Sequence, residues 1–192
     1  MRPLQIVVGG LVIVVLDLRF DGFDVVVDLI GWILVVKALR LLAVRDRAFA
    51  VAAVGAVLGG LGSIVQLVPG LTVGAGVVSV LGAVETLALT VVVVAICTGI
   101  ARVLAHEPQV VRHARILRAT DVALTVVALG LGSSPVLLSA GPTPGTTGWL
   151  VGAGAVVLLL GALTFVVLIW FLVFLWRLRD RPELQEQQPV VA

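Results

Sequence analysis

The chain has 192 residues, of which 60% are hydrophobic and only 12% are charged, and its mean hydropathy is +1.22. Soluble domains carry about 25% charged residues, so this composition excludes an ordinary soluble protein and predicts an integral membrane protein. The net charge of +2 follows from basic residues at the ends of apolar segments, and it requires no nucleic-acid partner.

Six apolar segments, separated by charged or Gly/Pro-rich stretches, come close to the about 20 residues that a transmembrane helix needs. The first segment is short and the last is long. The first resembles a signal peptide but lacks a small-x-small cleavage site, so we expect a retained helix. The sequence predicts an all-α, polytopic transmembrane helical bundle, with residues 1–176 as a single domain. The predicted spans are residues 3–18, 25–44, 48–68, 77–104, 120–140 and 149–176.

Four of the eleven acidic residues lie between and within the first two predicted spans, in the segment DLRFDGFDVVVDLIGW. Their spacing of four, three and four would place them on one face of a continuous helix. Gly22 instead favours a tight turn on the outer face, with Asp24 capping the second span. Asp28 falls inside that span, where a carboxylate normally faces the bundle or a wet cavity. The four acids are Asp17, Asp21, Asp24 and Asp28.

Residues 23–34, FDVVVDLIGWIL, resemble a signature of small, uncharacterised polytopic membrane proteins of Gram-positive bacteria. In that family a short first helix precedes a stretch like F-D-I-L-P-D-I-I-G-Y-I-L. Val27 stands where the signature has proline, and Trp32 where it usually has tyrosine, so a fixed break before Asp28 is not implied. The family brings no activity with it. The resemblance implies that the motif includes Asp24, Asp28 and Gly31.

Small residues recur every four positions on the third predicted span, at Gly55, Gly59 and Ser63. Such spacing lets helices approach closely, so we expect a central packing face or a dimer contact. The single cysteine, Cys97, excludes an intrachain disulfide and a cysteine-based metal site, and we expect it to pack between helices. Tryptophans near span ends are typical of the membrane interface. They are Trp32, Trp149, Trp170 and Trp176.

Glu85 is the second acid that we place within a predicted span. It precedes Arg102 by seventeen residues, and Asp28 precedes Arg45 by the same number. Because each arginine marks the cytoplasmic end of its span, the two carboxylates are expected at a similar depth near the outer face. They could then share an acidic site for a small cation, with Asp24 as a further weak metal ligand. Alternatively, Asp28 caps a helix start or pairs with Arg19, while Glu85 reaches the lipid headgroups.

The connectors between the predicted spans alternate between uncharged and basic. Twelve of the thirteen basic residues fall on one side, with only Arg19 opposite, so the positive-inside rule predicts that both termini are cytoplasmic. The second basic connector is expected to form a short amphipathic helix on the inner leaflet. Residues 177–192 are expected to form a short, polar, disordered tail. The uncharged connectors are 69–76 and 141–148, and the basic ones are 45–47 and 106–120.

No G-x-S-x-G, H-E-x-x-H or P-loop pattern is present, so we expect no enzyme and no cofactor. The scarcity of polar residues in the third, fifth and sixth spans favours a structural or accessory protein of the bacterial cell membrane. Its expected contacts are the lipid bilayer and helices of a membrane partner or of a second copy. The alternative is a cation- or proton-coupled transporter or ion-binding protein that uses Asp28 and Glu85. An intramembrane enzyme ranks last, because no nucleophile or oxyanion donor accompanies these acids.

Overall fold

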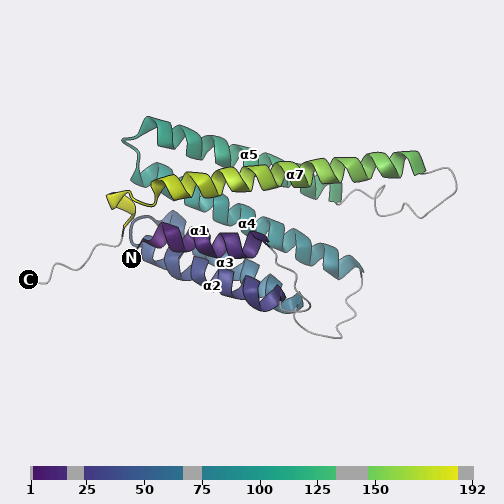
Figure 1. Ribbon diagram of the computed structural model, residues 1–192, viewed down its shortest axis with the longest axis horizontal. Coiled ribbons are helices and arrows are strands. Elements are labelled where there is room, and N and C mark those ends of the chain that lie inside the picture. Colours follow the sequence, from purple (N-terminus) through teal and green to yellow (C-terminus); the bar gives the residue numbers. More distant parts are fainter. Residues whose placement is uncertain (1, 17–23, 67–74, 133–146, 186–192) are drawn as a thin grey trace, which may run out of the picture.

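The computed structural model describes residues 2–16, 24–66, 75–132 and 147–185 (Figure 1). Within these residues the secondary structure is six α-helices and one 3-10 helix, without a strand, which confirms the all-α part of the prediction. The elements are α1 (Pro3–Leu16), α2 (Asp24–Leu42), α3 (Arg47–Gln66), α4 (Ala75–Val103), α5 (Pro108–Gly132), α7 (Thr147–Leu178) and η1 (Pro182–Leu184).

Three of the described helices are long and apolar enough to cross a membrane. The qualifying stretches are Arg47–Ile64 in α3, Gly82–Val103 in α4 and Leu158–Leu178 in α7. The other three fall short for identifiable reasons, since α1 has only 14 residues and both α2 and α5 carry several charges. Helices α4 and α7 have 29 and 32 residues, so they are about 43 Å and 48 Å long, more than the about 30 Å of a bilayer's hydrocarbon.

Helix boundaries follow local chemistry. Asp46 caps α3 by accepting a hydrogen bond from the Ala48 backbone N–H at 2.7 Å, which satisfies one donor that a helix start leaves free. Helix α5 begins at Pro108, a residue suited to the first helical position, and runs on without Gly or Pro as far as Gly130. Residues 108–132, which include most of the predicted connector and the first part of the predicted fifth span, are therefore one continuous helix, because charge alone does not break a helix.

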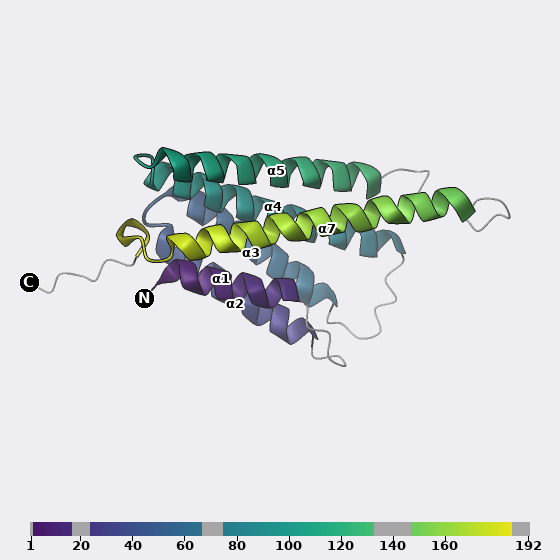
Figure 2. The same cartoon turned by 45° about the horizontal axis from the view of Figure 1, so that its top comes forward.

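The helices run up and down in antiparallel order, and each packs against its neighbour in the chain (Figures 1 and 2). Helix α7 closes the arrangement by packing against both α5 and α1. The start of α1, the α2–α3 turn, the α4–α5 turn and η1 thus lie at one end, which we call the basic end. Its arginines are Arg2, Arg45, Arg47, Arg102, Arg177, Arg179 and Arg181.

The hydrophobic core is concentrated in the half of the bundle nearer the basic end. There Leu39, Phe49, Ile100 and Phe171, from four different helices, are fully buried. Toward the other end α5 and α7 separate from the core. Among the described side chains, none after Leu117 in α5 and none at 155–166 of α7 is buried. The bundle is therefore tightly packed at the basic end and more open at the opposite end.

Candidate functional site

The aspartate segment is only partly described. Asp17 and Asp21 lie outside the described residues, and Asp24 is the first residue of α2, with its side chain outside the description. Asp28 lies one turn into α2 and is half-buried. Asp24 thus stands at a helix start, and Asp28 lies within the same helix.

Gly31, the third residue of the resemblance motif, lies at the crossing of α1 and α2. A Cβ atom at Gly31 would be 2.7 Å from the Gly10 carbonyl oxygen, and a Cβ at Gly10 would be 2.7 Å from the Gly31 carbonyl oxygen. The two backbones therefore touch where neither helix has a side chain. Close approach of this kind is the role of small residues in membrane helices, so the position of Gly31 is explained by packing.

Glu85 lines a cavity in the more open half of the bundle. The cavity has a volume of about 540 Å³ and lies between α1, α4, α5 and α7. Its wall is mainly apolar but includes the half-buried Glu85 and the threonines Thr86 and Thr164. Asp28 is not among the described residues that line it. The described part of the lining therefore offers one carboxylate and two hydroxyl groups in an apolar setting.

Metal binding by three or more convergent ligands finds no support in the part of the chain that the structure describes. There, no group of three or more His, Cys, Asp or Glu side chains lies close enough to hold one ion. Asp28 and Glu85 belong to different helices, α2 and α4, and the side chain of Asp24 falls outside this description.

A polar seam between α4 and α5, which the sequence analysis did not predict, joins the two helices. The hydroxyl groups of Thr90 and Thr125 lie 2.6 Å apart, and the Arg118 guanidinium donates to the Thr98 hydroxyl at 3.3 Å. The Asp121 carboxyl lies beside Thr90 between these two contacts. Hydrogen bonds between membrane helices stabilise packing by about 0.6 kcal/mol each.

The signal for this seam is present in the sequence as helical spacing. On α4 the threonines Thr90 and Thr98 are eight residues apart, about 80° around the helix, so they lie on the same side of it. On α5, Asp121 lies four residues before Thr125. Asp121 stood at the edge of the predicted fifth span, so it was not considered among the acids within spans.

The small-residue face on α3 packs against two helices. A Cβ at Gly55 would lie 3.0 Å from Val91 of α4, whereas a Cβ at Gly59 would lie 2.6 Å from the ring of Trp32 on α2. Ser63 is buried, and its hydroxyl donates to the Gly59 carbonyl at 3.3 Å. Gly55, Gly59 and Ser63 thus serve packing within the chain, and α3 packs between α2 and α4.

Trp32 departs from its predicted place at the membrane interface. Its side chain is only 1% exposed, and its ring packs over Gly59 and Gly60 of α3. The prediction used distance along the chain from the end of a span, but the rotation of α2 decides which neighbour the ring meets. Glycines on α3 leave room for a large ring, so it is buried between helices.

The segment after α7 is held against the basic end. Leu184 in η1 is 1% exposed and belongs to the main hydrophobic core. Because exposed ion pairs each contribute about 1 kcal/mol or less, this apolar side chain is the stronger anchor. Residues 186–192 lie outside the described part. The polar contacts are Arg2 Nη1 to Asp180 Oδ1 at 2.7 Å, Arg181 Nη2 to Glu107 Oε2 at 2.9 Å, and Arg45 Nη2 to the Gln185 carbonyl at 2.8 Å.

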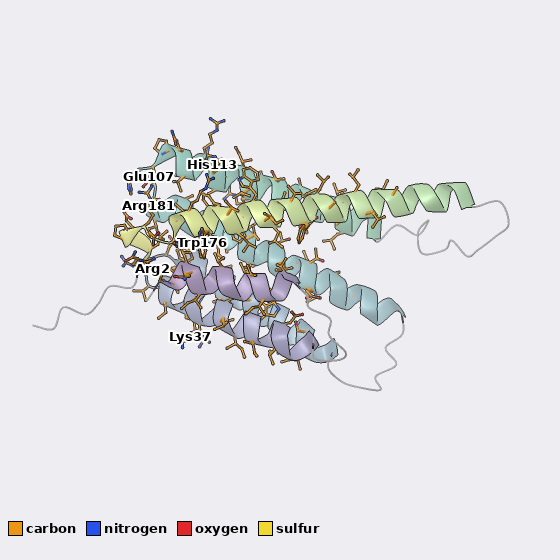
Figure 3. All side chains as sticks on the ribbon, viewed as in Figure 1. Arg2, Lys37, Glu107, His113, Trp176 and Arg181 are labelled. Atoms are coloured by element: carbon orange, nitrogen blue, oxygen red, sulfur yellow. The ribbon has the colours of Figure 1, made fainter. Side chains whose placement is uncertain are left out.

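The basic end gathers charged side chains from several helices, and Figure 3 shows that Arg2, Glu107 and Arg181 all lie at this end. A cavity of about 420 Å³ between the start of α5 and the end of α7 is lined by His113 and Arg181, among others. Arg177 also lines the cavity, and of the two arginines Arg181 pairs with Glu107, so part of the positive charge in this cavity is balanced within the protein.

The chain was compared with known protein families, curated proteins and solved structures. No model of a known protein family, no curated protein and no solved structure matches the chain.

Proposed function

We propose that this chain is a multi-pass protein of the bacterial cell membrane and acts as a structural or accessory protein through helix–helix interactions. In this proposal all six helices cross the bilayer, and the basic end and both termini lie in the cytoplasm. Three helices of membrane-spanning length, the antiparallel order and the arginines at one end support the topology.

The exposure of α7 is the observation that carries the proposed interaction role. Only 22% of its apolar stretch Leu158–Leu178 is buried, against 56% for the corresponding stretch of α3 and 44% for that of α4. Leu158, Leu159 and Val166 are 76%, 62% and 60% exposed. The far part of α7 also extends beyond the neighbouring helices (Figures 1 and 2). A long, unpacked apolar helix presents a surface on which a helix of a partner or of a second copy can pack.

Site-specific photo-cross-linking in native membranes tests this role. A photoreactive amino acid at Leu159 is expected to give one discrete protein adduct, and replacing Val166 by tryptophan is expected to abolish it. Val54 on α3 provides a matched control, because it is 61% exposed but belongs to a helix already packed on two sides. Lipid adducts alone at both positions would overturn the interaction role.

The family resemblance of residues 23–34 is retained as part of the proposal. Two of the motif residues have positions that a membrane bundle explains. Gly31 lies at the α1–α2 crossing, and Asp24 lies at the start of α2. The resemblance supports a membrane location and adds no activity.

A second candidate function, ion or proton binding coupled to transport, is favoured by the cavity around Glu85. A carboxylate in a mainly apolar cavity is costly unless a proton, a cation or a hydrogen-bonding partner accompanies it. The hydroxyl groups of Thr86 and Thr164 on the same wall could contribute oxygen ligands. Asp28 remains the second acid of this hypothesis.

Replacing Glu85 with glutamine tests the second candidate. If the cavity binds a cation, the wild-type protein in detergent is expected to melt at a higher temperature with that cation, and the variant is expected to lose the increase. Flux into proteoliposomes should fall in parallel for Glu85→Gln and for Asp28→Asn. Glu107→Gln at the basic end is the control and should behave as the wild type. Unchanged flux and unchanged cation response in both span variants would refute this candidate.

A further inference from the structure

A groove on the outer surface between α2 and α3 combines an apolar floor with two cationic side chains. The groove has a volume of about 530 Å³. Its floor includes Trp32 and Ala56, which are buried, and Gly60, which lets the groove come close to the Trp32 side chain. Ile33 and Leu61 on its edges are 57% and 53% exposed. The groove therefore exposes apolar surface that a bilayer component would cover.

The cations lie at the end of the groove nearer the basic end. Lys37 and Arg40 both line it, and Arg40 is in the last turn of α2. Both side chains are exposed, and no hydrogen bond or ion pair among the described residues includes either one. By contrast, Arg2, Arg102 and Arg181 each have a carboxylate partner. The positive charge beside the groove is thus not balanced by the described part of the protein.

We infer that this groove binds an anionic phospholipid of the cytoplasmic leaflet, with an acyl chain along the apolar floor and the phosphate between Lys37 and Arg40. The inference rests on the proposed topology, which puts these cations on the cytoplasmic side. Lys37 lies about 8 Å from the end of α2. Long basic side chains at this depth extend toward the headgroups, so both charges can meet one phosphate.

The shape and charge of the groove favour a lipid over a partner helix. From Arg40 back to Leu29 the lining residues of α2 cover about 16 Å along the helix, running from the headgroup level into the hydrocarbon. An acyl chain follows that direction and carries its phosphate at the end where the cations are. Basic pockets between membrane helices on the cytoplasmic side have this recognition chemistry for anionic headgroups. An apolar helix would leave both cations without a counter-charge.

Native mass spectrometry of the detergent-purified, delipidated protein tests the inference. Dioleoyl phosphatidylglycerol is expected to bind about tenfold or more tightly than dioleoyl phosphatidylcholine, because two cations contact its net negative headgroup. The double variant Lys37→Gln/Arg40→Gln should lose most of this preference. Arg112→Gln/Arg115→Gln removes the same charge from exposed positions on α5 and should retain it.

A second variant tests the apolar part of the groove. Leu61→Trp fills the groove from its exposed edge and leaves both cations in place, so it should also weaken phosphatidylglycerol binding. Inorganic phosphate, which has no acyl chain, is expected to give no thermal stabilisation. Equal binding of the two lipids, equal losses in the two double variants, or stabilisation by inorganic phosphate alone would overturn the inference.

The outcome is separable from that of the proposed topology. Lipid preference is measured in detergent and does not depend on which way the protein faces in the cell, whereas labelling in intact cells reports orientation without reporting lipid binding. A protein adduct from a photoreactive residue at Leu61, in place of lipid adducts, would assign the groove to a partner helix and contradict the lipid assignment.

Discussion

Replacing Trp32 with alanine is expected to lower the free energy of unfolding by about 4 kcal/mol. The indole is 1% exposed and fills the space that Gly59 and Gly60 leave on α3. Gly59 and Gly60 have no side chains that could fill that space. The substitution therefore leaves a cavity between α2 and α3 and removes the van der Waals contacts of the indole. Thermal or denaturant unfolding in detergent micelles measures the loss. Far-UV circular dichroism serves as the signal, because it does not rely on the fluorescence of the replaced tryptophan.

The matched control is Trp176→Ala, near the end of α7. This indole is 47% exposed, and the Arg179 guanidinium lies 3.8 Å from its ring centroid. An exposed cation–π contact contributes about 1 kcal/mol or less, so the control should change stability little. Similar losses at both tryptophans would contradict the packing of Trp32 between α2 and α3.

Replacing Gly31 with valine is expected to destabilise the protein by about 3 kcal/mol, through overpacking at the α1–α2 crossing. The new Cβ would lie 2.7 Å from the Gly10 carbonyl oxygen and 2.7 Å from Val14 Cγ2, so the two helices would have to separate. Gly10→Val should produce a similar loss. The Gly10→Val/Gly31→Val double variant should lose less stability than the sum of the two single losses, because one separation of α1 from α2 relieves both clashes.

The control for this crossing is Gly9→Val, one residue away on α1. No atom lies within 4 Å of the position that its Cβ would occupy, and valine has a higher helix propensity than glycine. Its unfolding temperature should equal or exceed that of the wild type. Tolerance of Gly31→Val, or equal sensitivity at Gly9 and Gly10, would show that the helices do not cross here.

The helices were largely predictable because length and apolarity determine where a chain can cross hydrocarbon. The predicted starts at residues 3, 25 and 48 each lie within one residue of the starts of α1, α2 and α3. The basic connector 106–120 was expected to form a separate amphipathic helix, so its continuity with the fifth span in α5 was not predicted, because the charges of Arg112 and Arg115 were taken to separate the two. Arginine is a good helix former, so helix and membrane span need not share a boundary.

Contacts between helices were harder to predict, since they depend on helix rotation. The four-residue spacing of Gly55, Gly59 and Ser63 indicated a packing face, and the structure places this face against α2 and α4. The same spacing could not tell which side chain would fill it, so the burial of Trp32 was missed. The contact between Asp121 and Thr90 was not predicted, because the two residues come together only when α4 and α5 pack antiparallel.

Cysteine labelling in intact bacteria tests most directly the central claim, that this is a multi-pass membrane protein with a cytoplasmic basic end. In a Cys97→Ala background, single cysteines replace Glu183 in η1 and Thr143 in the uncharged connector 141–148. A membrane-impermeant maleimide should label the Thr143 replacement in intact cells and the Glu183 replacement only after permeabilisation. Labelling of both sites from the same side, or labelling of Glu183 alone in intact cells, would contradict the account.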